Sequence, residues 1–390
     1  MPKICRGLVW TNNEPTHTML AAYTEIMPAL PTPPANELNN DITLTMICDY
    51  PHLFLLITPI NINHLESHLT THPNQVLVHS IILRFWQGFW PFAITENVPH
   101  PSIVDNSSCI IQDPAHVHEQ RDYKIQQGHF LPSFGQHLLP GMTAIPIGVI
   151  LKPHSDKLWL VVDQSSGDYS PNSFIPWQGV AVPLNNLHDL RAILCHVCVK
   201  HSNSTKLVVF KSNMLQAYRR LLLHFLWQNF QIITIDGQCH VNRNNNFGNH
   251  GAGGLWGMFM GIVWIAINVK HILDLLAYVD DTYSWEFANN ILWYEPYTCH
   301  FPAKQTCLLQ LWDELGVPHE CLKELFGSQL TIVGLDVDIN MMTVTMPKQS
   351  WRDLVEAMHT FANVGQCCSL CEFQRLDGWM NWSLNAYPLL

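Results

Sequence analysis

Two adjacent aspartates, Asp280 and Asp281, are the feature that most constrains what this chain can fold into. They lie in the stretch "LLAYVDDTYSW" (275–285), where apolar residues stand on both sides of them. A carboxylate beside apolar neighbours is costly unless it is paired or holds a metal, and two adjacent carboxylates also repel each other. The dipeptide alone is typical of an ordinary tight turn, so the rest of the chain has to decide between a turn and a site.

Composition bounds the class of protein. The chain has 390 residues, of which 47% are hydrophobic and only 13% are charged, so two or three domains with a sizeable core are expected and wholesale disorder is excluded. The net charge of −11 argues against simple nucleic-acid binding. Residues 151–280, however, carry 10 basic and 7 acidic side chains and form the basic segment of the chain, so we expect any phosphate-facing surface there.

The cysteines and the apolar runs indicate an intracellular protein, cytoplasmic or nuclear, with no membrane contact. The 12 cysteines have no regular spacing, and the start of the chain lacks a long apolar run, which favours reduced thiols. "CCSLC" (367–371) holds one C-x-x-C without a well-spaced second pair, so zinc binding is disfavoured. The most apolar stretch, residues 254–269, is short for a membrane span and is interrupted by glycines, which favours a buried core helix.

The chain divides by pattern into four parts. Residues 1–50 are rich in Pro, Thr and Asn and predict a loose leader. Residues 51–140 predict a mostly helical region, with helices broken at His72-Pro73. From residue 141 onward, β-rich runs alternate with helical ones: hairpins over 144–163 and 230–242, a strand over 206–213 that runs into a helix, a glycine-rich loop over 247–254, a strand–turn–strand around the two aspartates, a helix over 306–317, and a pair of strands over 328–346 with Asn340 in the turn.

No G-x-G-x-x-G or P-loop pattern follows a strand, which disfavours Rossmann and P-loop folds. Instead, paired carboxylates on a β-turn, downstream of a strand that ends in a polar residue, are the layout of a polymerase palm. Over roughly 140–390 the chain resembles a reverse transcriptase, an RNA-directed DNA polymerase. "YVDD" looks like the family's Y-x-D-D motif. "FKSNMLQAYRR" looks like its motif A, with Tyr218 at the aromatic gate and Asn213 at the first catalytic aspartate.

Other segments extend this resemblance in the expected order. "NNFGNHGAGG" resembles the motif B loop through Phe247 and Gly248. "GVILKPHSDKLWLVVD", which contains Lys152 and Trp159, resembles the fingers hairpin. "LGVPHECLKELFG" resembles motif D, with Lys323 at or near its lysine. "RLDGWMNWSLNAYPLL" resembles the first thumb helices. The region 51–110 looks like the upstream part of fungal DIRS-type or related retroelements.

The resemblance implies a right-hand α/β (α+β) polymerase fold. Residues 141–346 would form the fingers and palm, with an antiparallel palm sheet backed by helices, and residues 347–390 would begin a truncated thumb. In this family two Mg²⁺ (or Mn²⁺) ions about 4 Å apart stabilise the attacking and leaving oxygens. The implied partners are an RNA or DNA template–primer and deoxynucleotides.

The resemblance also implies a role for each site residue. Asp280, Asp281 and the side chain at Asn213 would hold the metals, and Lys323 would donate a proton to the leaving pyrophosphate. The nucleotide would be bound by residues from the gate, the motif B loop and the fingers hairpin: Tyr218, Phe247, Gly248, Lys152 and Trp159. Taken singly, Tyr218 could equally be a core aromatic, Gly248 a turn glycine, and Lys152 and Lys323 solvated lysines.

Three departures from the family pattern indicate a degenerate copy. Asn213 lacks the full negative charge of an aspartate, Trp159 stands where the family has an arginine that contacts the triphosphate, and the thumb is incomplete unless another chain supplies it. We therefore expect metal to bind weakly if at all, and nucleotidyl transfer to be lost or very weak. A non-catalytic nucleic-acid-binding or interaction scaffold is the alternative, and a two-metal nuclease ranks last. The polymerase interpretation requires Asn213 to lie within a few ångströms of the paired aspartates.

Overall fold

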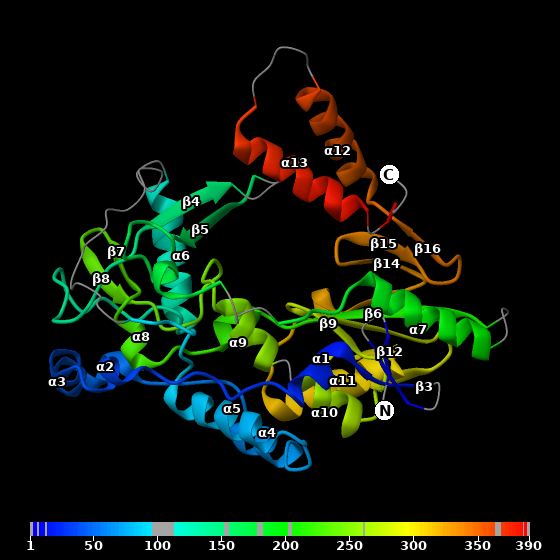
Figure 1. Ribbon diagram of the computed structural model, residues 1–390, viewed down its shortest axis with the longest axis horizontal. Helices are drawn as coiled ribbons and strands as arrows, with labels where there is room; N and C mark the ends of the chain where they lie inside the picture. The colour runs from blue at the N-terminus through cyan, green and yellow to red at the C-terminus, as the bar shows by residue number, and fades with distance from the viewer. Residues whose placement is uncertain are drawn as a thin grey trace. The chain divides into compact units, whose positions relative to one another are not determined.

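The computed structural model describes residues 3–5, 8–11, 14–95, 113–151, 156–177, 182–201, 205–259, 262–362, 368–384, 386 and 387 (Figure 1). The chain divides into two compact units. Unit 1 comprises Met1–Tyr23, Leu184–Leu215 and Ile262–Leu390, and unit 2 comprises Thr24–Pro183 and Gln216–Gly261.

A four-stranded antiparallel sheet is the centre of unit 1. Its strand order is β13-β6-β10-β9, with β6 (Leu207–Asn213) and β10 (Asp281–Phe287) in the middle. β9 (Leu276–Tyr278) pairs with β10, and β13 (Leu325–Gly327) pairs with β6. The two central strands are rich in β-branched and aromatic residues, which suit a pleated surface buried on both faces.

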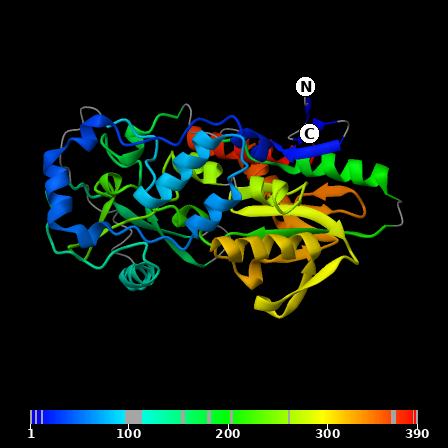
Figure 2. The same ribbon diagram turned by 90° about the horizontal axis from the view of Figure 1, so that it is seen from below.

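Helices cover both faces of this sheet, because side chains alternate from one face to the other along each strand. On one face, Leu190 and Ile193 of α7 (Leu187–Lys200) pack in one buried cluster with Val209 of β6. On the other face, Gln305 of α11 (Ala303–Leu315) donates a hydrogen bond to the Ser212 hydroxyl at 3.1 Å. Figure 2 shows α7 and α11 on opposite sides of the sheet.

The rest of unit 1 consists of small sheets and helices. Helices α12 (Lys348–Phe361) and α13 (Leu370–Ser383) pack side by side (Figure 1). The other elements are β1 (Lys3–Cys5), β2 (Leu8–Thr11), β3 (Glu14–Thr18), α10 (Ile262–Asn268), β11 (Ile291–Tyr294), η5 (Glu295–Tyr297), β12 (Cys299–Pro302), η6 (Cys321–Lys323), β14 (Gln329–Ile332), β15 (Leu335–Asp338) and β16 (Thr343–Thr345); α1 (Met19–Thr24) runs across the boundary between the units.

Unit 2 is built from helices and two hairpins. The predicted hairpins are both present, as β4 (Ile147–Leu151) with β5 (Leu158–Val162) and β7 (Ile232–Ile235) with β8 (Gln238–Val241). Asp236 and Gly237 form the tip of the second hairpin, with φ of 52° and 70°, as a type I′ turn requires. The helices are α2 (Ala35–Leu38), α3 (Asp41–Asp49), η1 (Pro51–Phe54), α4 (Ile62–His68), α5 (Gln75–Gln87), α6 (Pro114–Gln126), η3 (Pro171–Phe174), η4 (Ala217–Arg220), α8 (Phe225–Gln228) and α9 (Ala252–Phe259).

The structure differs from the sequence predictions in several places. Residues 1–50 are not a loose leader: they contain three strands and three helices, and Leu20, Met27 and Met46 are buried. The range 141–346 does not form one unit, since parts of it belong to each. Three strands, rather than two, occupy residues 328–346.

The predicted helices also differ in detail. Between the end of β6 at Asn213 and the start of β7 at Ile232, the chain forms the short helices η4 and α8 in place of the predicted long helix. The apolar stretch 254–269 forms parts of two helices, α9 and α10. Across the part of the chain that the structure describes, none of the helices has the length and apolar character needed to traverse a lipid bilayer.

Candidate functional site

The paired aspartates lie on a tight hairpin in unit 1. Tyr278 of β9 is the partner of Asp281 of β10, so the loop between them has only two residues, Val279 and Asp280. Val279 has a φ of 53°, which is an outlier for a β-branched residue and costs on the order of 1–3 kcal/mol. A positive φ at the first loop residue is typical of a type II′ turn, and this turn places Asp280 at the tip.

Asn213 lies directly beside this hairpin. It is the last residue of β6 and the strand partner of Asp281, and its Nδ2 donates a hydrogen bond to Asp281 Oδ1 at 2.9 Å. The next residue, Met214, donates its backbone N–H to the carbonyl of Asp280 at 2.9 Å. The structure therefore brings Asn213 and the two aspartates together at one end of the sheet, while their roles stay predictions.

Two lysines contact the same group. Lys323 Nζ donates to Asn213 Oδ1 at 3.2 Å, and Lys211 Nζ lies 3.7 Å from Asp281 Oδ2. Lys323 was predicted from the sequence, whereas Lys211 was not. The alternation of β6 could have found it, because residues 211 and 213 point to the same face of a strand.

Glu324, also missed, is buried on the face of the sheet that α11 covers. Burial raises the pKa of its carboxyl to about 7, and the negative charge of Asp281 acts in the same direction. Hydrogen bonds from the Ser212 hydroxyl, the Gln305 amide and the Asn213 backbone N–H partly oppose that shift. Glu324 therefore holds the end of β6 in place from the face of the sheet that α11 covers.

The residues of this group do not fit a two-metal centre. Such a centre needs several hard oxygen ligands free to point at the ions. Here both oxygens of Asp281 face donors, the Asn213 amide and Lys211, and the Asn213 oxygen faces Lys323. Within the described ranges, no cluster of three or more His, Cys, Asp or Glu side chains is arranged to hold a metal ion.

The predicted nucleotide-binding residues belong to unit 2. The Tyr218 ring lies 4.9 Å from the Phe247 ring and 6.2 Å from that of Trp256 in α9. Tyr218 is half-buried, whereas Phe247 is 57% exposed. Trp159 lies on β5, opposite Ile150 of β4, with about half of its surface exposed.

Asn172 holds the loop that contains Gly248. Its Nδ2 donates to the Gly248 carbonyl at 2.7 Å, and its Oδ1 accepts the backbone N–H of His250 at 2.8 Å. Gly248 has a φ of 89°, so the turn favours glycine there. Asn172 gave no sequence signal, and Lys152 lies outside the described residues.

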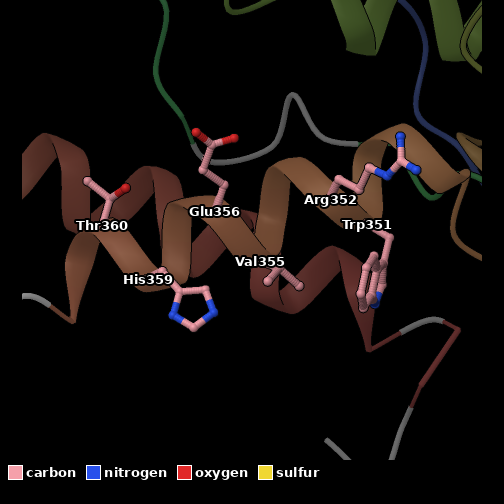
Figure 3. A pocket seen from close by; sticks show the side chains of 6 residues that line it. All are labelled: Trp351, Arg352, Val355, Glu356, His359 and Thr360. Atoms are coloured by element: carbon pink, nitrogen blue, oxygen red, sulfur yellow. The ribbon is translucent and has the colours of Figure 1, made fainter.

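A separate hollow lies along helix α12 and contains none of the predicted site residues. It is lined by Trp351, Arg352, Val355, Glu356, His359 and Thr360. Figure 3 shows the Glu356 carboxylate and the His359 ring pointing to opposite sides of the helix, so they do not form an acid–base pair.

Comparison with known proteins supports the fold. No family model matches the chain, and no curated protein matches it. A solved foamy viral protease–reverse transcriptase in complex with double-stranded DNA is similar, with a TM-score of 0.51 and 15% identity, over 92% of this chain and 53% of that one. A second structure, of the foamy viral protease–reverse transcriptase in complex with double-stranded DNA, gives a TM-score of 0.49 and 15% identity over 92% of this chain and 64% of that one. The chain thus has a reverse transcriptase-like fold with antiparallel sheets, and it spans about half the length of the first foamy viral chain.

Proposed function

We propose that this chain is a reverse transcriptase-like protein derived from a retroelement, DIRS-type or related, in which nucleotidyl transfer is lost or very weak. The observation that carries the proposal is Asn213, whose amide donates to Asp281 at the position where the family's first catalytic aspartate would stand. In this proposal β4 and β5 are the fingers hairpin, the β13-β6-β10-β9 sheet is the palm, and α12 and α13 begin the thumb.

The proposed loss of activity follows from charge. In the family's mechanism, carboxylates hold the ions that neutralise charge developing on the phosphate. Here an amide replaces one carboxylate, and Lys211 and the Asn213 amide already compensate the charge of Asp281. Losing several kcal/mol of transition-state stabilisation lowers a rate by roughly a thousand-fold or more, so Mg²⁺ or Mn²⁺ would bind weakly if at all.

Primer extension tests the proposal. The full chain would be assayed on a poly-A template with a primer and deoxynucleotides, in Mg²⁺ and separately in Mn²⁺. We expect no extension above the background of an Asp280→Ala variant. Robust extension that Asp280→Ala abolishes would show that the parent protein is an active polymerase.

Restoring the family residues tests whether only the site has decayed. The double variant Asn213→Asp with Trp159→Arg returns one metal carboxylate and one phosphate-binding cation. Extension by the double variant, with none by the parent, would support a polymerase scaffold with a decayed site. If the double variant folds correctly but extends no primer, changes at these two positions alone do not explain the loss of nucleotidyl transfer.

The alternative is a non-catalytic nucleic-acid-binding scaffold. The similar foamy viral protein holds double-stranded DNA, and Lys211 and Lys323 place two cations beside the aspartates. Binding of an RNA–DNA primer–template would be measured as a function of salt concentration. A slope of log affinity against log salt near zero would exclude contact with backbone phosphates.

A further inference from the structure

Another hollow in unit 1 lies between η5, α11 and the loop that follows α11. It has a volume of about 310 Å³, which suits a small ligand. The residues that line it include four with rings, one proline and one acid: Tyr294, Tyr297, Trp312, His319, Pro296 and Asp313. We call it the aromatic hollow.

The rings of the aromatic hollow converge on His319. The centre of its imidazole lies 5.4 Å from the Tyr297 ring, 5.7 Å from the Trp312 ring and 6.3 Å from the Tyr294 ring. Tyr294 and Trp312 are buried, whereas Tyr297 is half-buried. Tyr297 is therefore the ring that a ligand from solvent meets first, and the other two form the inner wall.

Hydrogen bonds hold these side chains in place. The Tyr297 hydroxyl lies 2.6 Å from His319 Nδ1, and His319 Nε2 lies 3.2 Å from Asp313 Oδ1. Because an ionised carboxylate accepts only, Nε2 carries the proton and Nδ1 accepts from Tyr297. The Tyr294 hydroxyl donates to the other oxygen of Asp313, Oδ2, at 2.6 Å.

The charge of Asp313 is not matched by a cation. Burial lowers the pKa of His319, although the hydrogen bond and the charge of Asp313 oppose that shift, so the imidazole is neutral near pH 7. Among the described residues that line the hollow, none is a lysine or an arginine. The two lysines of residues 291–324, Lys304 and Lys323, donate to Asp274 and Asn213 instead.

The aromatic hollow is therefore suited to a cation and not to an anion. The Asp313 side chain is 46% exposed, so a ligand can approach it from solvent. A positive charge is also attracted to the face of an aromatic ring such as that of Tyr297.

We propose that the aromatic hollow binds an N-methylated ammonium group, carried by a small free ion or by a lysine side chain. Both oxygens of Asp313 already accept a hydrogen bond, and a primary ammonium would bring three further N–H donors that need acceptors. Methyl groups need none, and they fit the apolar surfaces of Pro296 and Pro318 that also line the hollow. This site does not depend on polymerase activity.

Saturation-transfer NMR of the full chain with choline chloride tests the proposal. The reference ligand is 3,3-dimethyl-1-butanol, which has the shape of choline without its charge, and sodium chloride keeps the ionic strength equal. We expect saturable choline binding with a dissociation constant of about a millimolar, and binding of the neutral alcohol about tenfold weaker or less. Equal binding of the two ligands, or no binding of choline, would overturn the proposal.

Substitutions separate the charge from the ring. Asp313→Asn removes the charge and should weaken choline binding about tenfold. Tyr297→Leu removes the exposed ring and should weaken choline binding by roughly threefold to tenfold, with no effect on the neutral alcohol. Tyr297→Phe keeps the ring and should retain most of the affinity. Loss of affinity for both ligands to the same degree in Tyr297→Leu would show that the ring acts only through packing, against the proposal.

Glu314→Gln is the matched control for Asp313→Asn. Glu314 is the next residue of α11, its carboxylate pairs with Lys270 at 2.9 Å, and it is not among the described residues that line the hollow. The control removes the same charge from the same helix and should leave choline affinity unchanged. Equal weakening by Glu314→Gln and Asp313→Asn would assign the effect to net charge and overturn the site.

Two lysine derivatives identify the source of the ammonium group. Binding of N-acetyl-trimethyl-lysine methylamide that is tighter than that of choline would support a methylated lysine side chain as the ligand, and equal or weaker binding would support a small free ion. The same derivative without methyl groups should bind several-fold more weakly than its trimethylated form. Equal binding of the two derivatives would refute the requirement for methyl groups.

Discussion

Replacing Asn213 by Asp is the most direct probe of the group around the paired aspartates. The substitution turns the 2.9 Å hydrogen bond from the Asn213 amide to Asp281 into a contact between two carboxylates. At about 4 Å and an effective dielectric constant of about 20, two like charges repel by ~4 kcal/mol. A lost hydrogen bond to a charged group costs a further ~1.5–3 kcal/mol.

Lys323 offsets part of this cost. It already donates to the Asn213 oxygen at 3.2 Å, and that contact becomes an ion pair in the variant. Together these effects predict a loss of roughly 2–4 kcal/mol in the free energy of unfolding when divalent ions are absent.

Urea unfolding in EDTA, and then in millimolar Mg²⁺ or Mn²⁺, measures both halves of the prediction. For the parent protein we expect the same urea midpoint in both conditions, because both carboxylate oxygens of Asp281 already face donors within the protein. For Asn213→Asp we expect a lower midpoint in EDTA and recovery with the ions, since a ligand that binds the folded state stabilises it by mass action.

Asn381→Asp is the matched control for this experiment. Asn381 also donates to a carboxylate, that of Asp377 at 3.2 Å, but on the exposed surface of α13. Its loss should cost only a few tenths of a kcal/mol and should show no response to metal. The reasoning is refuted if Asn213→Asp is as stable as the parent in EDTA, or if metal stabilises both variants equally.

Three further substitutions test single features of the fold. Burial raises the folded-state pKa of Glu324 from 4.5 to about 7, so the folded state holds the carboxyl proton more tightly than the unfolded state does. The free energy of unfolding should therefore fall by up to ~3 kcal/mol as the pH rises from about 4.5 to above 7. Urea unfolding as a function of pH should show that Glu324→Gln removes this loss. Val279→Gly should raise the free energy of unfolding by about 1 kcal/mol, because relief of the positive φ of 53° outweighs the larger backbone entropy that glycine loses on folding. An unchanged or lower urea midpoint would argue against strain in the turn. Gly88→Ala would place a Cβ 2.5 Å from the His224 backbone, at a backbone conformation (φ 88°, ψ 154°) that is open almost only to glycine. Gly128→Ala meets nothing within 4 Å, so we expect Gly88→Ala to cost ~2 kcal/mol or more beyond Gly128→Ala, and equal thermal shifts would contradict this.

The strands that carry the aspartates could be predicted because their signals are local. The run from Leu276 to Tyr278 and the one from Asp281 onward are apolar and aromatic, and the two residues between them suit a turn. The same reasoning placed Asn213 at the end of the neighbouring strand. The alternation of that strand also puts Lys211, two residues earlier, on the same face as Asn213.

The segment after Asn213 could not be predicted in the same way. Its apolar residues favour a long helix, but Gln216 adopts a φ of 56°, which ends regular structure. Leu222 and Leu223 then form bridges with Asn244 and Phe89. Contacts from distant parts of the chain override the local helical preference.

The asparagine-rich run 242–249 shows the same limit. A polar run with a glycine is typical of an exposed loop, yet Asn242, Asn245 and Asn246 are fully buried. Asn242 donates to Asn246 at 3.0 Å, and Asn246 donates to the Gln231 oxygen at 2.9 Å. Burial of an amide depends on such a partner, and this partner lies more than ten residues away in the sequence.

The group around the paired aspartates has its charges compensated within the protein. Beside the hairpin, Lys211 compensates Asp281 and Lys323 contacts the Asn213 oxygen, so this group is nearly neutral by itself and gains little from a metal. Mg²⁺ should therefore leave the melting temperature of the parent protein unchanged, which is the reverse of what an intact two-metal polymerase site would give.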